Sequence, residues 1–315
     1  MHEEQMQFRH GFGLREPSVG DLGARQGADE TLRFCRPRCA AKARFAARRS
    51  GDGDRCIIGR ILFLCELLDH PRLPALLRGL ARQPGVIRHP LSELSLLPPI
   101  DEQEVWAAGV TYERSKTAQM AESDFSATAY DLVYEAERPE LFFKSLPEKV
   151  VGPGDRVGIR RDARWNVPEP ELALVFNSRR RLVGVTIGND MSSRDLEGEN
   201  LRYLPQAKFY DRACALGPWI AVGATEKAIR NWTISLEIRR QGTVEFHGET
   251  PVARITRTFN SLGEWLFRSQ TFAHGAVLLT GTGIVPPDDF TLEANDEVAI
   301  AISGIGLLSN PVAVV

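Results

Sequence analysis

Three carboxylates in the middle of the chain have the spacing to hold a divalent cation. Glu169 and Glu171 stand on either side of Pro170, directly before an apolar run, and Asp190 follows the next apolar run. Side chains alternate along an extended chain, so the two glutamates share a face, about 6 to 7 Å apart. Oxygen ligands that leave part of an octahedron open favour Mg²⁺ or Mn²⁺. We therefore predict a Mg²⁺ site, with Mn²⁺ or Ca²⁺ as substitutes.

The same three residues also allow a simpler interpretation. Glu169 and Glu171 could be solvated at a strand edge, and Asp190 could cap a helix that begins at Ser192. An isolated pair of glutamates two residues apart favours that interpretation. The surrounding sequence decides between the two.

Short β-like runs separated by turn signals surround the three carboxylates. Residues 233–240 and 243–247 flank Gln241-Gly242, where glycine supplies the positive φ of a hairpin turn. Helices are few, and residues 260–268 are the clearest. The sequence after residue 100 thus predicts a mainly β (α+β) domain, with strands at 105–110, 141–144, 156–160, 171–176, 183–188 and 219–222.

The first 100 residues differ from the rest of the chain in composition and in hydrophobic pattern. Residues 1–60 contain eleven arginines and no sustained period of 2 or 3.6, and one hypothesis is that they are translated from an unintended frame. Residues 58–81 have helical spacing broken at His70-Pro71 and at Pro74, which predicts one or two short helices. We expect a small N-terminal region over 1–100 and a catalytic domain over 101–315.

Size and charge narrow the class of partner. The chain has 315 residues and a formal net charge of −2, which gives no basic field to attract nucleic acid. Its longest apolar run, 57–68, is interrupted by charges and is far shorter than the roughly 20 residues that span a bilayer. The first residues lack the pattern of a signal peptide. We expect a cytoplasmic protein that binds a small molecule and neither nucleic acid nor membrane.

Four segments together resemble the fumarylacetoacetate hydrolase superfamily, from about residue 101 to the C-terminus. They are PEPELALVF (168–176), GNDMSSRD (188–195), YLPQAK (203–208) and GIG (304–306). The resemblance implies a mixed β-sandwich or roll with a small N-terminal domain, commonly as a homodimer or homotetramer. It also implies a cation on Glu169, Glu171 and Asp190, with Lys208 and Thr282 contacting a 2-oxo acid substrate.

Within the superfamily, residues 192–208 most resemble the 2-keto-3-deoxy-pentonate dehydratases, and Glu140 falls where these place a catalytic carboxylate. Hydrolytic members carry a histidine where this sequence has Ser115, and serine cannot take a proton at neutral pH without a partner base. The resemblance therefore implies a Mg²⁺-dependent hydro-lyase of pentose catabolism. It would dehydrate 2-dehydro-3-deoxy-D-arabinonate, or a related pentonate, to 2,5-dioxopentanoate.

Such a dehydration needs a base near C3 and an acid near the departing C4 hydroxyl. Glu140 and Lys208 are the candidates, and the sequence leaves open which takes which step. Arg114 and Ser115 could bind substrate hydroxyls or lie on an exposed helix. Three of the site residues have a structural alternative: a surface position for Glu140, a salt bridge to Asp211 or Glu197 for Lys208, and closure of a glycine turn for Thr282.

Two other functions remain open at this point. One is C–C bond hydrolysis of acylpyruvates or 2,4-diketo acids, which product analysis would distinguish from dehydration. The other is a binding or assembly protein that keeps the fold without turnover. Three converging carboxylates without a cation repel one another, and this favours a metal-binding enzyme over the inactive protein.

Overall fold

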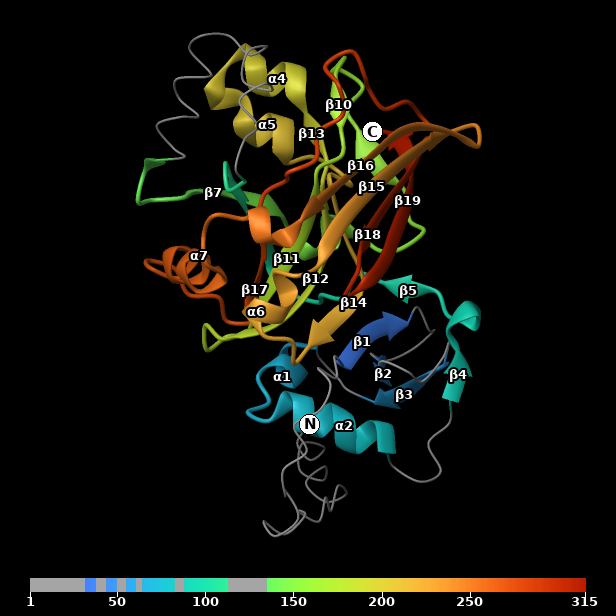
Figure 1. Cartoon of the computed structure of the whole chain (residues 1–315), viewed down its shortest axis with the longest axis vertical. Helices are drawn as coiled ribbons and strands as arrows, with labels where there is room; N and C mark the ends of the chain where they lie inside the picture. The colour runs from blue at the N-terminus through green and yellow to red at the C-terminus, as the bar shows by residue number, and fades with distance from the viewer. Residues whose placement is uncertain (1–31, 38–43, 50–54, 61–63, 83–87, 113–134) are drawn as a thin grey trace, which may run out of the picture.

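The computed structural model describes residues 32–37, 44–49, 55–60, 64–82, 88–112 and 135–315. Figure 1 shows a mainly β molecule in which helices α1 and α2 lie beside strands β1–β3 at one end, while α4 and α5 lie at the opposite end. The α+β class predicted from the spacing of the short apolar runs is thus confirmed.

A twelve-stranded sheet crosses the molecule. Its main path runs β4 (Arg88–Pro90), β3 (Arg55–Arg60), β2 (Arg44–Arg49), β1 (Leu32–Pro37), β14 (Cys214–Val222), β12 (Leu182–Asp190), β11 (Pro170–Phe176), β17 (Ala276–Leu279), β6 (Glu104–Gly109) and β7 (Glu140–Ser145). Two short strands lie off this path: β5 (Leu96–Leu97) pairs with β1, and β8 (Val150–Val151) pairs with β14.

Strand directions bring five chain segments to one edge of this sheet. β11 is antiparallel to both β12 and β17, β6 is parallel to β17, and β7 is antiparallel to β6. The beginnings of β11 and β7 therefore lie at the same edge as the ends of β12, β17 and β6. Every candidate site residue on these strands stands at that edge.

A second sheet packs on the first and completes the core. It runs β16 (Thr243–Pro251), β15 (Thr233–Arg240), β18 (Glu297–Ile302), β19 (Gly306–Val314) and β9 (Val157–Ile159), and a separate pair joins β10 (Asn166–Val167) to β13 (Ser192–Ser193). Leu172 of the first sheet shares one buried cluster with Leu236 and Ile300 of the second. The predicted hairpin is confirmed, with φ of 51° at Gln241 and 87° at Gly242.

Helices in the described residues are short. They are α1 (Leu64–Leu68), α2 (Leu73–Arg82), α4 (Arg194–Glu199), α5 (Leu204–Lys208), α6 (Glu226–Ile229) and α7 (Phe259–Leu266), with 3₁₀ turns at Leu91–Glu93, Pro147–Lys149, Leu201–Tyr203 and Val252–Arg254. The break at His70-Pro71 separates α1 from α2, as predicted. No helix in this part of the chain is long and apolar enough to cross a membrane.

Strands β1–β3 lie in the region where the sequence predicted no regular structure. β1 pairs antiparallel with β14, and β2 and β3 extend the sheet outwards from it. The sheet therefore continues from the N-terminal region into residues 101–315. The division near residue 100 stays a prediction, and residues 1–31 lie outside the described ranges.

Candidate active site

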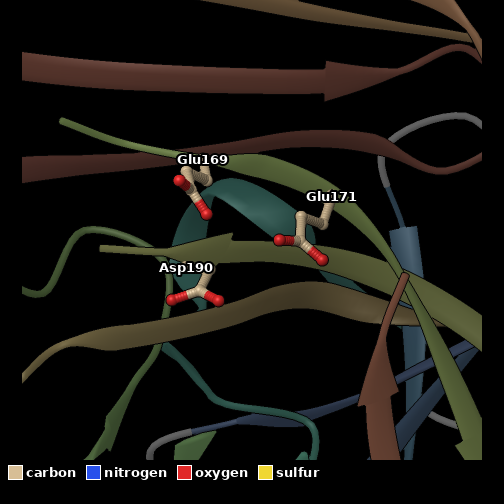
Figure 2. A group of neighbouring side chains, drawn as sticks. All are labelled: Glu169, Glu171 and Asp190. Atoms are coloured by element: carbon tan, nitrogen blue, oxygen red, sulfur yellow. The ribbon is translucent and has the colours of Figure 1, made fainter. Parts of the chain in front are cut away.

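Strand register places the three predicted metal ligands together. Glu171 on β11 is paired with Gly188 on β12, and the Asp190 N–H donates to the Glu169 carbonyl oxygen at 2.9 Å. Cross-strand partners share a face, so Asp190 lies beside the two glutamates. The carboxylates offer one oxygen each within 4.8 Å of one another, around one space (Figure 2). The sequence predicted this grouping from alternation and strand ends.

The simpler interpretation of these carboxylates is wrong. Glu169 is 6% exposed, and Glu171 and Asp190 are each 1% exposed, so none is solvated at a strand edge. The residue that caps helix α4 is Ser193, while Asp190 ends strand β12.

Lysine and arginine side chains partner two of the three carboxylates. Lys208 Nζ lies 2.7 Å from Glu169 Oε2, and Arg194 Nη2 lies 2.6 Å from Glu169 Oε1. Lys144 Nζ forms an ion pair with Asp190 Oδ1. Burial alone would raise the pKa of Glu169, but Lys208 and Arg194 lower it to about 2. The repulsion expected between bare carboxylates is therefore partly compensated by the protein itself.

Glu171 is the carboxylate with the least compensation. Its Oε2 accepts a hydrogen bond of 2.5 Å from the Gly281 N–H. Burial, then the charges of Asp190 and Glu169, raise its pKa well above the usual range. Among the described residues, Asp190 Oδ2 has no hydrogen-bond partner. Anionic oxygens buried in this way fit a hard divalent cation such as Mg²⁺.

Lys208 is the last residue of α5, and its side chain points into the site. Its ammonium donates to Glu169 Oε2 and, at 2.6 Å, to Ser192 Oγ, and it lies 3.8 Å from Glu197 Oε2. Burial would lower the pKa of Lys208, but Asp190, Glu169 and Glu197 together raise it above its usual value. The salt-bridge alternative holds in part for Glu197, whereas Asp211 pairs with Lys149. The negative charges around Lys208 thus favour its protonated form.

Glu140 begins β7 and is half-buried instead of lying on the surface. Burial, then the negative charge of Glu197, raise its pKa above the usual range for glutamate. Its register partner on β6 is Gly109, where a Cβ atom would overlap the Glu140 carboxylate and come within 2.8 Å of its Cδ. The absence of a side chain at Gly109 makes the room that this carboxylate occupies.

The glycine loop follows β17 at the same edge. Gly281 has φ of 86°, which places its N–H towards Glu171. The Thr282 hydroxyl donates to the Ile284 carbonyl oxygen at 3.1 Å and accepts from the Ile284 N–H at 3.3 Å. Thr282 therefore closes the turn in this structure, and its contact with substrate stays a prediction.

Two of the predicted substrate-binding residues, Arg114 and Ser115, lie outside the described residues. Sequence reasoning missed Lys144, Arg194 and Gly109. A signal existed for Lys144, because a lysine inside an apolar strand is costly unless its ammonium is paired.

Comparisons with known proteins agree with this architecture. The family described as Fumarylacetoacetate (FAA) hydrolase C-terminal matches residues 104–313. A probable 2-keto-3-deoxyxylonate dehydratase of Haloferax volcanii is 45% identical over 217 residues, which cover 69% of this chain and 74% of that protein. The 2-dehydro-3-deoxy-D-arabinonate dehydratase of Saccharolobus solfataricus is 40% identical over 225 residues, which cover 70% and 76%.

A solved structure is also similar over almost its whole length. It is a 2-keto-3-deoxy-D-arabinonate dehydratase complexed with magnesium and 2,5-dioxopentanoate. The two chains are 31% identical with a TM-score of 0.72, over 91% of this chain and 99% of the other. The resemblance read from the four sequence segments is confirmed. The chain belongs to the fumarylacetoacetate hydrolase family.

Proposed function

We propose that this protein is a Mg²⁺-dependent dehydratase that converts a 2-keto-3-deoxy pentonate to 2,5-dioxopentanoate. The observation that carries the proposal is the buried triad of Glu169, Glu171 and Asp190, with the Lys208 ammonium beside it and Glu140, a carboxylate of raised pKa, at the same edge of the sheet. The dehydratase relatives from Haloferax volcanii and Saccharolobus solfataricus support this reaction over C–C hydrolysis.

The triad would hold the cation, which when bound polarises the 2-keto group and acidifies the protons on C3. Glu140 is the base that takes a C3 proton, because its raised pKa makes its carboxylate more basic than usual. Lys208 keeps its proton and orients the substrate by charge. The departing C4 hydroxyl takes up the C3 proton from Glu140 and leaves as water, which forms a C3=C4 double bond. Moving one hydrogen from C5 and one from its hydroxyl to C3 and C4 then gives the aldehyde.

Product analysis tests the proposal directly. Purified protein incubated with Mg²⁺ and 2-dehydro-3-deoxy-D-arabinonate should form 2,5-dioxopentanoate, a semialdehyde, with one water lost per turnover. An acylpyruvate is the comparison substrate in the same assay. Release of pyruvate and a second acid from the acylpyruvate, with no semialdehyde from the pentonate, would instead identify a C–C hydrolase.

The pH dependence of kcat should report Glu140. Its pKa is raised by burial and by Glu197, and as a base it must be deprotonated. We expect kcat to fall as the pH drops through this raised pKa, at saturating Mg²⁺. Glu197→Gln removes the like charge and should move this acidic limb to lower pH. A limb that stays in place would contradict the assignment of Glu140 as the base.

Gly109→Ala should impair catalysis without removing any catalytic group. The added methyl would meet the carboxyl end of the flexible Glu140 side chain, so the fold can accommodate it by moving that carboxylate. Since small displacements of catalytic groups cost up to about 10²-fold, we expect kcat to fall 10- to 100-fold. Gly198→Ala, on an exposed part of α4 with open space around it, is the matched control. Wild-type kcat in Gly109→Ala would show that the Glu140 position is unimportant.

We further propose the finer properties that the sequence predicted. Mg²⁺ is the cation in use, and Mn²⁺ or Ca²⁺ can replace it. The protein works in the cytoplasm as a homodimer or homotetramer, with a small N-terminal region over 1–100 and the catalytic domain over 101–315. Activity assays with Mg²⁺, Mn²⁺ and Ca²⁺ in turn test the choice of cation. Size-exclusion chromatography with light scattering tests the oligomeric state.

A further inference from the structure

Lys144 is a buried lysine that the proposed reaction does not use. It stands near the end of β7, its exposed fraction is 0%, and it is among the largest fully buried side chains of the described residues. Burying an ammonium group is unfavourable unless its donors are satisfied and its charge is paired. Its contacts should therefore explain why a lysine stands there.

The ion pair and the two hydrogen bonds of Lys144 all go to the site. Its Nζ pairs with Asp190 Oδ1, donates to the Met191 carbonyl oxygen at 2.9 Å, and donates to the Lys208 carbonyl oxygen at 2.5 Å. Lys144 and Glu140 are four residues apart on β7, so they point to the same face of the strand. One ammonium thus joins β7 to the end of β12 and to the end of α5.

We propose that Lys144 is a positioning residue that fixes both the Asp190 carboxylate and the Lys208 backbone, an inference that rests on the proposed function. Lys144 forms an ion pair with Asp190 Oδ1, whereas Oδ2 has neither an ion pair nor a hydrogen-bond partner among the described residues. The Lys208 carbonyl lies in the last turn of α5, where carbonyls lack partners within the helix. Anchoring it holds the backbone from which the Lys208 side chain reaches Glu169.

A second explanation predicts a different result. If Lys144 only neutralised the charge of Asp190, its removal would leave a more negative site, which would bind Mg²⁺ as tightly as before or more tightly. If Lys144 positions Asp190, its removal weakens Mg²⁺ binding even though the site becomes more negative. The direction of the change in Mg²⁺ affinity separates the two explanations.

The experiment compares Lys144→Met with Lys149→Met by calorimetric titration of the metal-free proteins with Mg²⁺. Lys149 also pairs with an aspartate, Asp211, but on the surface. Removing a group that orients a metal ligand typically costs 10- to 100-fold, so we expect Lys144→Met to bind Mg²⁺ about 10-fold more weakly or worse. We also expect kcat to fall by about 100-fold at saturating Mg²⁺, because Lys208 is displaced from the position in which it orients the substrate. Lys149→Met should match the wild type in both.

Several outcomes would overturn the inference. Mg²⁺ affinity in Lys144→Met that equals or exceeds the wild-type value leaves charge neutralisation as the explanation. If Lys144→Met does not fold, Lys144→Gln, whose amide can donate to carbonyl oxygens without a charge, takes its place with the same expected weakening. Failure of both variants to fold, with and without Mg²⁺, would show a requirement of the fold and not of the site. A wild-type protein that binds no Mg²⁺ would refute the proposed function itself.

Discussion

Glu171→Gln is expected to lose measurable Mg²⁺ binding while the protein stays folded. Glu171 is the triad member whose charge no lysine or arginine of the described residues pairs with, so a cation would balance it most directly. Glutamine keeps the shape and can still accept the Gly281 hydrogen bond, but it removes one of three anionic ligands. Metal polarisation supplies several kcal/mol of transition-state stabilisation, so activity should fall by about 10³-fold. Calorimetry and a steady-state assay measure the two effects.

The same change should stabilise the metal-free protein. Burial and the charges of Asp190 and Glu169 raise the pKa of Glu171, so the folded state keeps a proton that the unfolded state has already released. Stability of the metal-free protein therefore falls as the pH rises from the usual glutamate pKa towards the raised one, and Glu171→Gln removes this loss. In chelator at neutral pH, the variant should have a higher Tm than the wild type.

Asp296→Asn is the matched control for Glu171→Gln. Asp296 is also buried, but it accepts two hydrogen bonds of 2.8 Å from Arg240, far from the triad in sequence and directly before β18 of the second sheet. Its loss should lower the Tm and leave Mg²⁺ affinity unchanged. Wild-type Mg²⁺ affinity in Glu171→Gln would exclude the triad as the metal site.

The metal triad could be predicted from the sequence because local geometry determines most of it. Alternation along β11 places Glu169 and Glu171 on one face, whatever the rest of the fold does. Asp190 needs only that its strand pair with β11 in a register that puts their ends together. Both conditions follow from two apolar runs that are joined by a short connection.

The cations around the triad could not be predicted in the same way. In the sheet order β11, β17 and β6 stand between β12 and β7, so Lys144 does not reach Asp190 through neighbouring strands. The chain after β7 instead returns to the sheet as β8, which pairs with β14 at Cys214, the register partner of Asp190, and no local pattern encodes that return. The Arg194 contact to Glu169 likewise depends on how α4 folds over the sheet edge. Bare carboxylates repel one another, but here Lys144, Arg194 and Lys208 offset part of that repulsion, and the sequence alone does not show that these cations reach the triad.

Strands β1–β3 were missed for a related reason. Their residues alternate weakly, and their place in the sheet follows from pairing with β14, about 190 residues away. A sequence pattern reveals a strand whose own residues mark it as one. It does not reveal a strand whose place is determined only by the strand with which it pairs. The apolar run of β11 was predicted because a short continuous apolar run by itself indicates a buried strand, and β11 is buried along its whole length. Only 219–222 of β14 were predicted, because its first five residues include Gly217 and Pro218 and form no such run.

Glu140→Gln is expected to lower kcat by about 10²- to 10⁴-fold, the usual contribution of a general base, while Mg²⁺ affinity stays at the wild-type value. Glutamine fills the space beside Gly109 but cannot take a proton at any pH in the assay range. The matched control is Glu137→Gln, an exposed glutamate three residues earlier whose backbone carbonyl oxygen, not its side chain, accepts from Arg257. Glu137→Gln should have wild-type kcat.

Solvent deuterium separates the two steps in which Glu140 could act. If Glu140 removes the C3 proton, the wild type in deuterated water should exchange hydrogen at C3 of the substrate, and Glu140→Gln should lose exchange and dehydration together. If the variant exchanges C3 normally but does not dehydrate, Glu140 acts on the departing hydroxyl, and another group is the base. The contacts of Lys208 argue for the first result, because its ammonium donates to Glu169 Oε2 and to Ser192 Oγ and is thereby held as a hydrogen-bond donor beside the triad.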